Sequence, residues 1–515
     1  MRIGIDVGGT NTDAVLMDGT EVLAFHKTPT TADVTSGITS ALQAILAETD
    51  TSPDTISTVM IGTTHFTNAV VERRRLTAVA AIRLGLPATK ILPPMVDWPE
   101  DLRQAIGNHK YLAHGGHEFD GREISTLDEK ELRQIAAEIR ENGIRSVAVS
   151  SVFSPVNPQL EDQAAAILQA EIPNLSVTTS HEIGRIGLLE RENAAIMNAC
   201  LHDLAVQIVT SFEKALTDLN IHAPFYLSQN DGTLMNAEFA ERYPVLTFAS
   251  GPTNSMRGAA FLSGIKEAMV VDVGGTTSDV GMLIHGFPRE ASVVVSVGGV
   301  RTNFRMPDVY SFGLGGGSLV RNENGDLRIG PDSVGFELTT KALVFGGNTL
   351  TTTDIAVANG LADIGDSAAV RSLDRHMVQN AVATIQEMTE IAVDRMKTSA
   401  EPIPVIVVGG GSILIGRAVR GASEMIKPPH FAVANAIGAA IAQVGGETDR
   451  IFSLDKIDRE EALAQAREEA SQKAIGAGAN PATIQIVDVE EVPLTYLPSN
   501  ATRIRIKAVG DLLMA

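Results

Sequence analysis

Two short motifs in the sequence carry residue types that contact phosphate groups in proteins. The first motif begins at Asp6 with Asp-Val-Gly-Gly-Thr, and the second begins at Asp272 with the same five residues, 266 positions further along. Glycine lets backbone N–H groups approach phosphate oxygens closely, and the threonine hydroxyl adds one more donor. The residues expected to contact phosphate are Gly8, Gly9, Thr10, Asn11, Gly274, Gly275, Thr276 and Thr277.

The aspartates that open the two motifs have a chemistry of their own. Asp6 and Asp272 each lie at the end of an apolar stretch, where we expect the two carboxylates to face one cleft. Mg²⁺ that accompanies nucleotide phosphates keeps several waters and is held by one or two carboxylates. One such motif alone is most often a plain glycine turn, but two matched copies that both retain the aspartate favour phosphate and Mg²⁺ binding.

Hydrophobic strands must position both motifs. Arg2–Ile5 precedes the first motif and Ala268–Val271 precedes the second, and another apolar stretch follows each of them. This pattern is typical of a strand, a glycine turn and a second strand. A third glycine cluster, Gly409–Gly411, follows the predicted strand Ile403–Val408. The repeated arrangement predicts an α/β protein built from duplicated lobes.

The sequence pattern divides the chain into three regions. We expect a first lobe over residues 1–186 with an inserted segment at about 86–123, a second lobe region over residues 187–448, and a small α/β appendage over residues 449–515. The second region is predicted to begin with a long helical stretch, Leu188–Leu219, and to contain a strand at Val245–Ala249. Two strands, Ala482–Val489 and Ala501–Val509, are predicted in the appendage.

Composition excludes several classes of protein. The chain has 515 residues and a formal net charge of −21, which disfavours nucleic acids and anionic lipid surfaces as partners. Its one cysteine, Cys200, excludes a disulfide within the chain and a zinc site of the Cys-x-x-Cys type. The N-terminal residues do not resemble a signal peptide, and we find no apolar segment of about 18 residues, so we expect a cytoplasmic protein.

The paired motifs resemble those of the actin-like ATPase superfamily, which includes sugar kinases, actin and the Hsp70 chaperones. In that superfamily two such hairpins hold the phosphates of a nucleotide from opposite lobes. The third glycine cluster looks like the adenosine motif of the superfamily, and Ala434–Ala440 looks like its second connecting helix. The resemblance implies duplicated actin-like (ribonuclease H-like) lobes that bind ATP with Mg²⁺, with Gly409, Gly410 and Gly411 near the adenosine.

Within this superfamily the sequence is similar to the hydantoinase A/5-oxoprolinase family. The similarity begins in the first 19 residues and covers most of residues 1–445. The other segments that carry it are Gly62–Arg73, Gly115–Glu123, Glu190–Glu192, Ser228–Gly232, Ser250–Pro252, the second hairpin and Gly313–Ser318.

The family resemblance implies an ATP-dependent, ring-opening amidohydrolase of the N-methylhydantoinase or 5-oxoprolinase type. ATP would phosphorylate the oxygen of a small cyclic amide, and water would then attack the activated carbon. The sequence stops soon after the nucleotide-binding core, whereas many relatives continue or work with a separate B-type subunit. We therefore expect one subunit of a two-component enzyme, with a homo-oligomer as the alternative.

A polar cluster at the start of a predicted helix is the candidate substrate site. Thr64, His65 and Asn68 lie where backbone N–H groups favour an anionic group, although an ordinary helix cap explains them equally well. Together with the two motif aspartates they complete the predicted catalytic set, which is Asp6, Asp272, Thr64, His65 and Asn68.

Other residues and other functions are weaker candidates. His114, His117, Glu118 and Asp120 have the spacing of a metal site, but a surface hairpin explains them better. Among the functions, a sugar kinase of the ROK type or an iron–sulfur activator ATPase requires cysteines that this chain lacks. A chaperone that reactivates a partner enzyme uses the same ATPase fold and is the alternative to an amidohydrolase.

Overall fold

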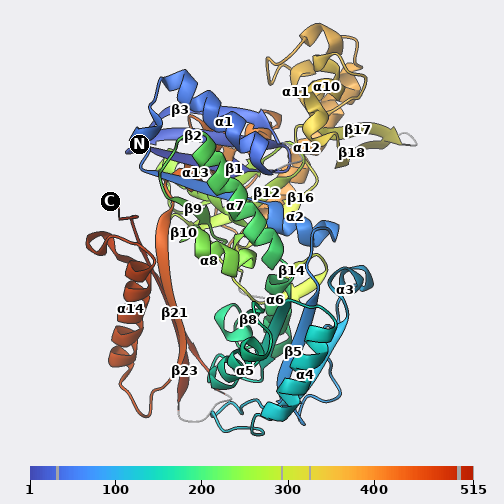
Figure 1. Cartoon of the computed structure of the whole chain (residues 1–515). Coiled ribbons are helices and arrows are strands. Elements are labelled where there is room, and N and C mark those ends of the chain that lie inside the picture. The colour runs from blue at the N-terminus through green and yellow to red at the C-terminus, as the bar shows by residue number, and fades with distance from the viewer. Residues whose placement is uncertain (31–33, 292–293, 324–325, 496–499, 514–515) are drawn as a thin grey trace.

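The computed structural model describes residues 1–30, 34–291, 294–323, 326–495 and 500–513, and all structural statements below concern these residues. Three sheets of four or more strands, two two-stranded sheets and the helices packed on them form the described part of the molecule (Figure 1). In Figure 1 the N-terminal hairpin lies in the upper half, and the C-terminal strands descend from it along one side. Residues 31–33, directly before the first helix, lie outside the described ranges. So do residues 514 and 515, the last two of the predicted appendage.

The largest sheet has nine strands and holds the first glycine motif. Its order is β22, β23, β21, β10, β9, β4, β1, β2 and β3. The strands are β1 (Arg2–Val7), β2 (Asn11–Asp18), β3 (Glu21–Pro29), β4 (Thr58–Thr63), β9 (Phe225–Ser228), β10 (Thr233–Asn236), β21 (Gln443–Ser453), β22 (Gln485–Pro493) and β23 (Ala501–Gly510). β1 pairs antiparallel with β2, which places Asp6 opposite Asp13, and parallel with β4. The predicted hairpin is confirmed.

Helices cover both faces of this sheet because β1 and β2 are apolar on both sides. Ile3 and Ile5 are fully buried and share a core with Ile38 of α1 (Val34–Thr49), and the opposite face packs on α13 (Ala434–Ala440). A Cβ added to Gly4 would lie 2.1 Å from the carbonyl oxygen of Ala436, so α13 lies directly on the strand backbone. Glycine is required at this close approach.

The second sheet holds the second motif and has the same local geometry. Its strands are β11 (Ala268–Val273), β12 (Ser278–Ile284), β13 (Phe287–Pro288), β16 (Val309–Phe312), β19 (Ile403–Val408) and β20 (Ala422–Ile426). β11 pairs antiparallel with β12, with Asp272 opposite Asp279, and parallel with β19. The two motifs therefore occupy equivalent positions in two sheets, which confirms the prediction of a repeated hairpin.

Further helices and two short strand pairs follow in this half of the chain, and the pair at residues 295–302 packs on the core of the first sheet. The helices are α10 (Leu338–Lys341), α11 (Thr352–Ala358) and α12 (Arg375–Met396), and the short strand pairs are β14 (Val295–Val297) with β15 (Val300–Thr302) and β17 (Ser318–Glu323) with β18 (Asp326–Ser333). Met269, Val271 and Val273 of β11 share one core with Ile385 and Val393 of α12. This core holds the second hairpin in place.

A four-stranded parallel sheet forms the third layer. Its order is β6, β5, β7 and β8, and its elements are β5 (Val79–Leu86), α3 (Glu100–Ile106), β6 (His109–His114), α4 (Glu129–Glu141), β7 (Ser146–Ser151), α5 (Gln159–Glu171) and β8 (Ser176–Thr179). The segment expected as an insertion at 86–123 thus contains a helix and a strand of this sheet. Figure 1 shows this layer below the N-terminal hairpin, beside the C-terminal strands.

Two sequence predictions in the following region are wrong in detail. The helical stretch Leu188–Leu219 is two helices, α6 (Leu188–Ala199) and α7 (His202–Asp218), bent by 50° at their junction. The expected strand Val245–Ala249 is a 3₁₀ turn, Pro244–Thr247, followed by α9 (Ser250–Ser263). Pro244 has no N–H to donate to a strand ladder, and Asn230 binds the N–H of Ala249 instead. The short helix α8 (Ala237–Arg242) precedes this turn.

Among the described helices, none is by itself long and apolar enough to cross a membrane. The bent pair α6 and α7 passes that test together on length and composition, and both helices bury one or more faces in the core.

The C-terminal strands extend the first sheet. β21 pairs with β10 and β23, β22 pairs with the other side of β23, and α14 (Arg459–Gly476) covers them. The strands predicted at 482–489 and 501–509 are present as β22 and β23. The division of the chain at residues 186 and 448 stays a prediction.

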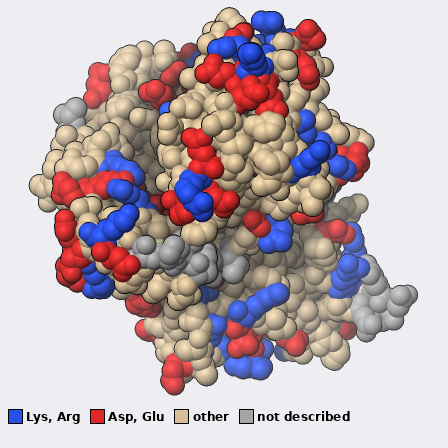
Figure 2. All heavy atoms as spheres, turned by 90° about the horizontal axis from the view of Figure 1, so that it is seen from below, with Lys and Arg blue, Asp and Glu red and all other residues tan. Residues whose placement is uncertain are grey.

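Charged side chains are spread over the molecular surface. On the face seen in Figure 2, acidic and basic residues are intermixed. Many form exposed ion pairs, such as Arg459 with Glu491 and Arg133 with Glu171, and such pairs contribute little to stability.

A buried ion pair joins α6 to the four-stranded sheet. Arg83 of β5 is 0% exposed and Glu192 of α6 is 2% exposed, and the Arg83 Nε lies 2.7 Å from Glu192 Oε2. The Ser150 hydroxyl of β7 also donates to this carboxylate. In the family-like segment Glu190–Glu192, the second and third residues are therefore buried within the protein.

We expect Glu192→Gln to lower the free energy of unfolding by about 3–5 kcal/mol, because it leaves the Arg83 guanidinium buried without its counter-charge. Urea denaturation measures the change. The exposed pair supplies the control, Glu171→Gln, which should cost about 1 kcal/mol or less. Equal losses in the two variants would contradict the structural role of the buried pair.

Candidate active site between the glycine hairpins

A cavity of about 690 Å³ lies between the two glycine hairpins. Every residue predicted to contact the nucleotide lines it, namely Gly8, Gly9, Thr10, Asn11, Gly274, Gly275, Thr276, Thr277, Gly409, Gly410 and Gly411. The Oγ1 atoms of Thr10 and Thr276 lie 3.3 Å apart. The hairpins of the two sheets therefore meet across one cleft, as their repeated sequence predicts.

The third glycine cluster packs directly on the second hairpin. Gly409 has φ of +85°, and a Cβ there would lie 2.2 Å from Asp272 Oδ1. A Cβ at Gly411 would lie 2.5 Å from the carbonyl oxygen of Gly274. Both positions need glycine for space, and Gly409 needs it for backbone conformation as well.

A fourth glycine run, which contains Gly316 and Gly317, is hydrogen-bonded to the second hairpin. The N–H groups of Gly316 and Gly317 donate to the carbonyl oxygens of Gly274 and Gly275 at 3.0 and 2.7 Å. This run belongs to the segment Gly313–Ser318, which carries part of the family resemblance in the sequence. These bonds fix the backbone of the second hairpin at the cavity.

Asp6 lies beneath the first hairpin in a buried polar cluster. It is 4% exposed and accepts hydrogen bonds from the amides of Asn254, at 3.3 Å, and Asn435, at 3.0 Å. The same Asn435 amide donates to Asp13, which also pairs with Lys27 at 2.8 Å. Burial, reinforced by the neighbouring Asp13 charge, raises the pKa of Asp6 to about 6.

The second hairpin carries its carboxylates in a similar setting. Asp272 lines the cavity, and burial raises its pKa above the usual range. Burial raises the pKa of Asp279 to about 6, although a hydrogen bond from Ser311 opposes the shift. The cleft thus brings buried carboxylates of the first hairpin and partly buried carboxylates of the second near the space where phosphates would lie.

Sequence reasoning missed two residues of this cluster. Lys27 of β3 is the basic side chain among the described residues that line the cavity. Asn254 of α9 donates a hydrogen bond to Asp6. Neither belongs to a glycine motif. Their proximity depends on sheet pairing and helix packing, which no local signal reveals.

Two of the three predicted substrate residues line the cleft. Thr64 and Asn68 line the cavity, while His65 does not. α2 (His65–Glu72) starts after Thr64, whose hydroxyl makes no capping bond to the helix and donates to the carbonyl oxygen of Val7 instead. The side chain of Thr64 is therefore tied to the first hairpin.

His65 has a supporting position beside the cleft. Its Nδ1 lies 2.6 Å from the Thr63 hydroxyl, and burial lowers the pKa of the ring to about 4. The imidazole is neutral at physiological pH and holds the strand end against the start of α2.

The histidine-rich segment does not assemble into a metal site. His114 pairs with Glu131, His117 with Asn157 and Asp120 with Arg122. In the part of the chain that the structure describes, no group of three or more histidine, cysteine, aspartate or glutamate side chains is placed to hold a metal ion directly.

The lone cysteine, Cys200, is buried. Burial raises the pKa of the Cys200 thiol to about 12, which disfavours a nucleophilic thiolate.

The fold of this molecule is that of two solved structures. ATP-dependent caprolactamase from Pseudomonas jessenii matches with a TM-score of 0.80 and 21% identity, over 100% of this chain and 88% of that one. Nucleotide-free acetone carboxylase matches with a TM-score of 0.71 and 16% identity, again over 100% and 88%. These matches and the paired hairpins confirm the predicted fold class, duplicated actin-like lobes.

The family follows from the sequence itself. Residues 2–172 match the hydantoinase/oxoprolinase N-terminal region, and residues 191–396 match the hydantoinase/oxoprolinase region. The two matches cover most of the chain, which therefore belongs to the hydantoinase/oxoprolinase family. This confirms the resemblance stated on the motifs.

Curated relatives include proteins with named activities. The alpha subunit of Pseudomonas jessenii caprolactamase is 27% identical over 85% of this chain and 65% of its own length. The gamma subunit of Aromatoleum aromaticum acetophenone carboxylase is 27% identical over 70% and 53%. The 5-oxoprolinase of Saccharomyces cerevisiae is 28% identical over 45% and 18%. The chain thus spans less than two thirds of the length of each of these relatives.

We expect His65→Asn to reduce the loss of stability on acidification. The folded protein holds the ring with a pKa of about 4, whereas the unfolded chain takes up a proton near pH 6.5, so the parent loses stability as the pH falls between these values. The expected contribution is about 3 kcal/mol at most. Urea denaturation at pH 7.5, 6 and 5 measures it.

The exposed His222→Asn variant is the matched control and should follow the parent. If His65→Asn also follows the parent at all three pH values, the ring takes up a proton as readily in the folded protein as in the unfolded chain, which contradicts its burial against Thr63.

Proposed function

We propose that the protein is an ATP-dependent cyclic amidase that phosphorylates a small cyclic amide and hydrolyses it. The observation that carries this proposal is the convergence of both glycine hairpins, the third glycine cluster and the polar residues Thr64 and Asn68 on one cavity. The caprolactamase and 5-oxoprolinase relatives support the substrate class.

The cavity has the groups that a nucleotide triphosphate requires. Backbone N–H groups of the two hairpins would bind the phosphate oxygens, and Lys27 would add a positive charge. Gly409, Gly410 and Gly411 would pass beside the adenosine, next to the apolar side chains of Ile413 and Phe345 on the same cavity wall.

The carboxylates of Asp6 and Asp272 fit Mg²⁺, which prefers oxygen ligands and retains water. Their raised pKa values, with Asp13 as a further acidic neighbour of both, indicate carboxylates that a nearby cation would stabilise. When bound with ATP, the ion would neutralise phosphate charge. We propose these two residues as its holders, through water.

The chemistry that this cleft would support joins two difficult steps. An unstrained amide is a poor electrophile, so its oxygen first attacks the terminal phosphorus and ADP leaves. Water then adds to the amide carbon and the ring C–N bond breaks, which leaves an amino acyl phosphate. A second water hydrolyses this acyl phosphate, which releases phosphate and gives the amino acid. Thr64 and Asn68 would position the amide, and neutral His65 would hold their helix in place.

Partners and location remain part of the proposal. The relatives named as alpha and gamma subunits belong to multi-subunit assemblies, which supports a B-type subunit as partner, with a homo-oligomer as the alternative. The cytoplasmic location stays a prediction.

We expect cyclic amides to stimulate ADP release by this protein. Hydantoin, 5-oxoproline and caprolactam are the probes, each tested with MgATP by a coupled assay, alone and with a B-type subunit. The matched linear amides are the control, because they lack a ring to open. A flat response to the whole panel under both conditions would overturn the proposed activity and favour the partner-remodelling chaperone.

We expect Asp6→Asn and Asp272→Asn each to weaken MgATP binding by about tenfold or more, because each removes a charge that would hold the hydrated ion. Titration calorimetry measures the affinity, and Asp18→Asn, at the exposed end of β2, is the control. If both variants stay within twofold of the parent, the assignment of these carboxylates to metal and nucleotide is wrong.

A further inference from the structure

One aromatic side chain that lines the phosphate cleft is largely exposed to solvent. Phe336 is 62% exposed and lies on the 3₁₀ turn Gly335–Glu337, directly before α10. Figure 1 shows α10 and α11 at the opposite end of the molecule from the four-stranded sheet. An exposed phenylalanine ring that lines a cavity has an apolar face available for a flat ligand group.

Backbone hydrogen bonds connect this turn to the second glycine hairpin. The N–H of Gly317 donates to the carbonyl oxygen of Gly275 at 2.7 Å, and the N–H of Val334 donates to the carbonyl oxygen of Gly317 at 2.9 Å. Phe336 follows Val334 by two residues. The turn is therefore held at a fixed position relative to the backbone that would bind the phosphates.

The side chains that line this part of the cleft are mostly apolar. Leu338, Phe345 and Ile364 line it together with Phe336. The backbone of the third glycine cluster leaves space beside it, because a Cβ added to Gly410 would have no heavy atom within 4 Å except those of its chain neighbours. Among the described lining residues, the charged side chains are on β2, β3 and β11, and they are Asp13, Lys27 and Asp272.

Few side chains of this segment can read the edge of a base. Among its described lining residues, those with hydrogen-bonding groups are Thr339 and Thr353, and the Thr353 hydroxyl donates to the carbonyl oxygen of Gly316 at 2.8 Å. A hydroxyl both donates and accepts, so that of Thr339 suits the amino group of adenine and the carbonyl oxygen of guanine equally well. Strong discrimination requires polar groups that only one ligand can satisfy.

We propose that Phe336 stacks on the base of the bound nucleotide, and that the cleft holds this base by stacking without reading its edge. The proposal rests on the proposed function, which places a nucleotide in the cleft. Every nucleobase has an aromatic face, so stacking contributes affinity but little selectivity. The two hairpins bind the phosphates, which are common to all nucleotides.

Titration calorimetry of the full chain, without a cyclic amide, tests the proposal. The probes are MgADP, MgGDP and, as a ligand without a base, magnesium tripolyphosphate. We expect the parent to bind the two nucleotides with affinities within tenfold of each other. Phe336→Ala should weaken the binding of both nucleotides by about tenfold, and should leave the affinity for tripolyphosphate within about twofold of the parent.

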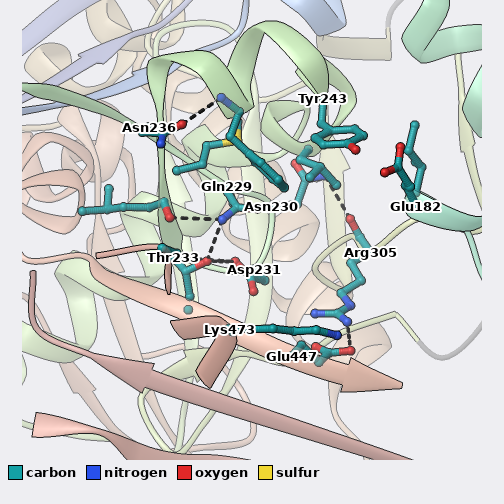
Figure 3. Close-up of a pocket in the computed structure, with 18 of the residues that line it drawn as sticks. Glu182, Gln229, Asn230, Asp231, Thr233, Asn236, Tyr243, Arg305, Glu447 and Lys473 are labelled. Carbon is teal, nitrogen blue, oxygen red and sulfur yellow. Dashed lines mark hydrogen bonds and ion pairs between the residues drawn. The ribbon is translucent and has the colours of Figure 1, made fainter. Parts of the chain in front are cut away.

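The matched control is Phe239→Ala. Phe239 of α8 is 43% exposed and lines the cavity shown in Figure 3, where its ring centre lies 4.6 Å from that of Tyr243. None of the described residues that line that cavity also lines the phosphate cleft. This variant should keep both nucleotide affinities within about twofold of the parent. Thermal unfolding similar to the parent verifies that both alanine variants are folded.

Phe336→Trp tests the contact itself. The one native tryptophan, Trp98, is 4% exposed, and its ring nitrogen donates to Asn193 at 2.7 Å. We expect the introduced indole to preserve nucleotide affinity, because it also stacks on bases. Its fluorescence should change when MgADP or MgGDP binds and stay constant with tripolyphosphate, whereas the fluorescence of the parent should stay constant with all three probes.

Several outcomes would overturn the stacking role of Phe336. They are a preference of more than tenfold between MgADP and MgGDP, parental nucleotide affinity in Phe336→Ala, an equal loss of tripolyphosphate affinity in that variant, and constant fluorescence of Phe336→Trp while a nucleotide binds. The failure of the proposed function is a separate result. Because these titrations contain no cyclic amide, a flat ATPase response would overturn the amidase, while base-dependent binding would still support the stacking.

Discussion

The close meeting of Thr10 and Thr276 is the constraint on which the rest of the structure depends. Two hairpins from separate sheets can enclose one triphosphate only if their backbones face each other across a narrow gap. Each sheet supplies a parallel neighbour that fixes its hairpin, β4 for the first and β19 for the second. The glycine runs at Gly316–Gly317 and Gly409–Gly411 then pack on the backbone of the second hairpin.

Buried charge is handled in two different ways in this molecule. Within the four-stranded sheet, Arg83 and Glu192 satisfy each other completely, so the charges serve to fix α6 on the strands. Around Asp6, the amides of Asn254 and Asn435 supply hydrogen bonds but no counter-charge. Complete pairs of the first kind give structural stability, whereas carboxylates with neutral partners keep their charge available for a cation.

Local sequence signals predicted the hairpins and the family. They could not predict the side-chain contacts between elements that lie far apart in the sequence. A strand, two glycines and a second strand form a contiguous pattern, so Asp6 and Asp272 were found from the sequence alone. Lys27 and Asn254 reach the same cluster through sheet register and helix packing over long separations, and neither lies in a motif. The expected strand at Val245–Ala249 fails for the same reason, since the distant Asn230 side chain takes its backbone donor.

The crossing of α9 and α13 has a consequence for motion. A Cβ at Gly258 or Gly438 would lie 1.8 Å from a carbonyl oxygen of the other helix, so the spacing of the two helices is set by backbone atoms alone. Side chains can change rotamer to allow sliding, but backbone atoms in contact cannot. α9, α13 and the β1 backbone under Gly4 therefore behave as one rigid body, and the spacing of these three elements stays fixed in any opening of the cleft.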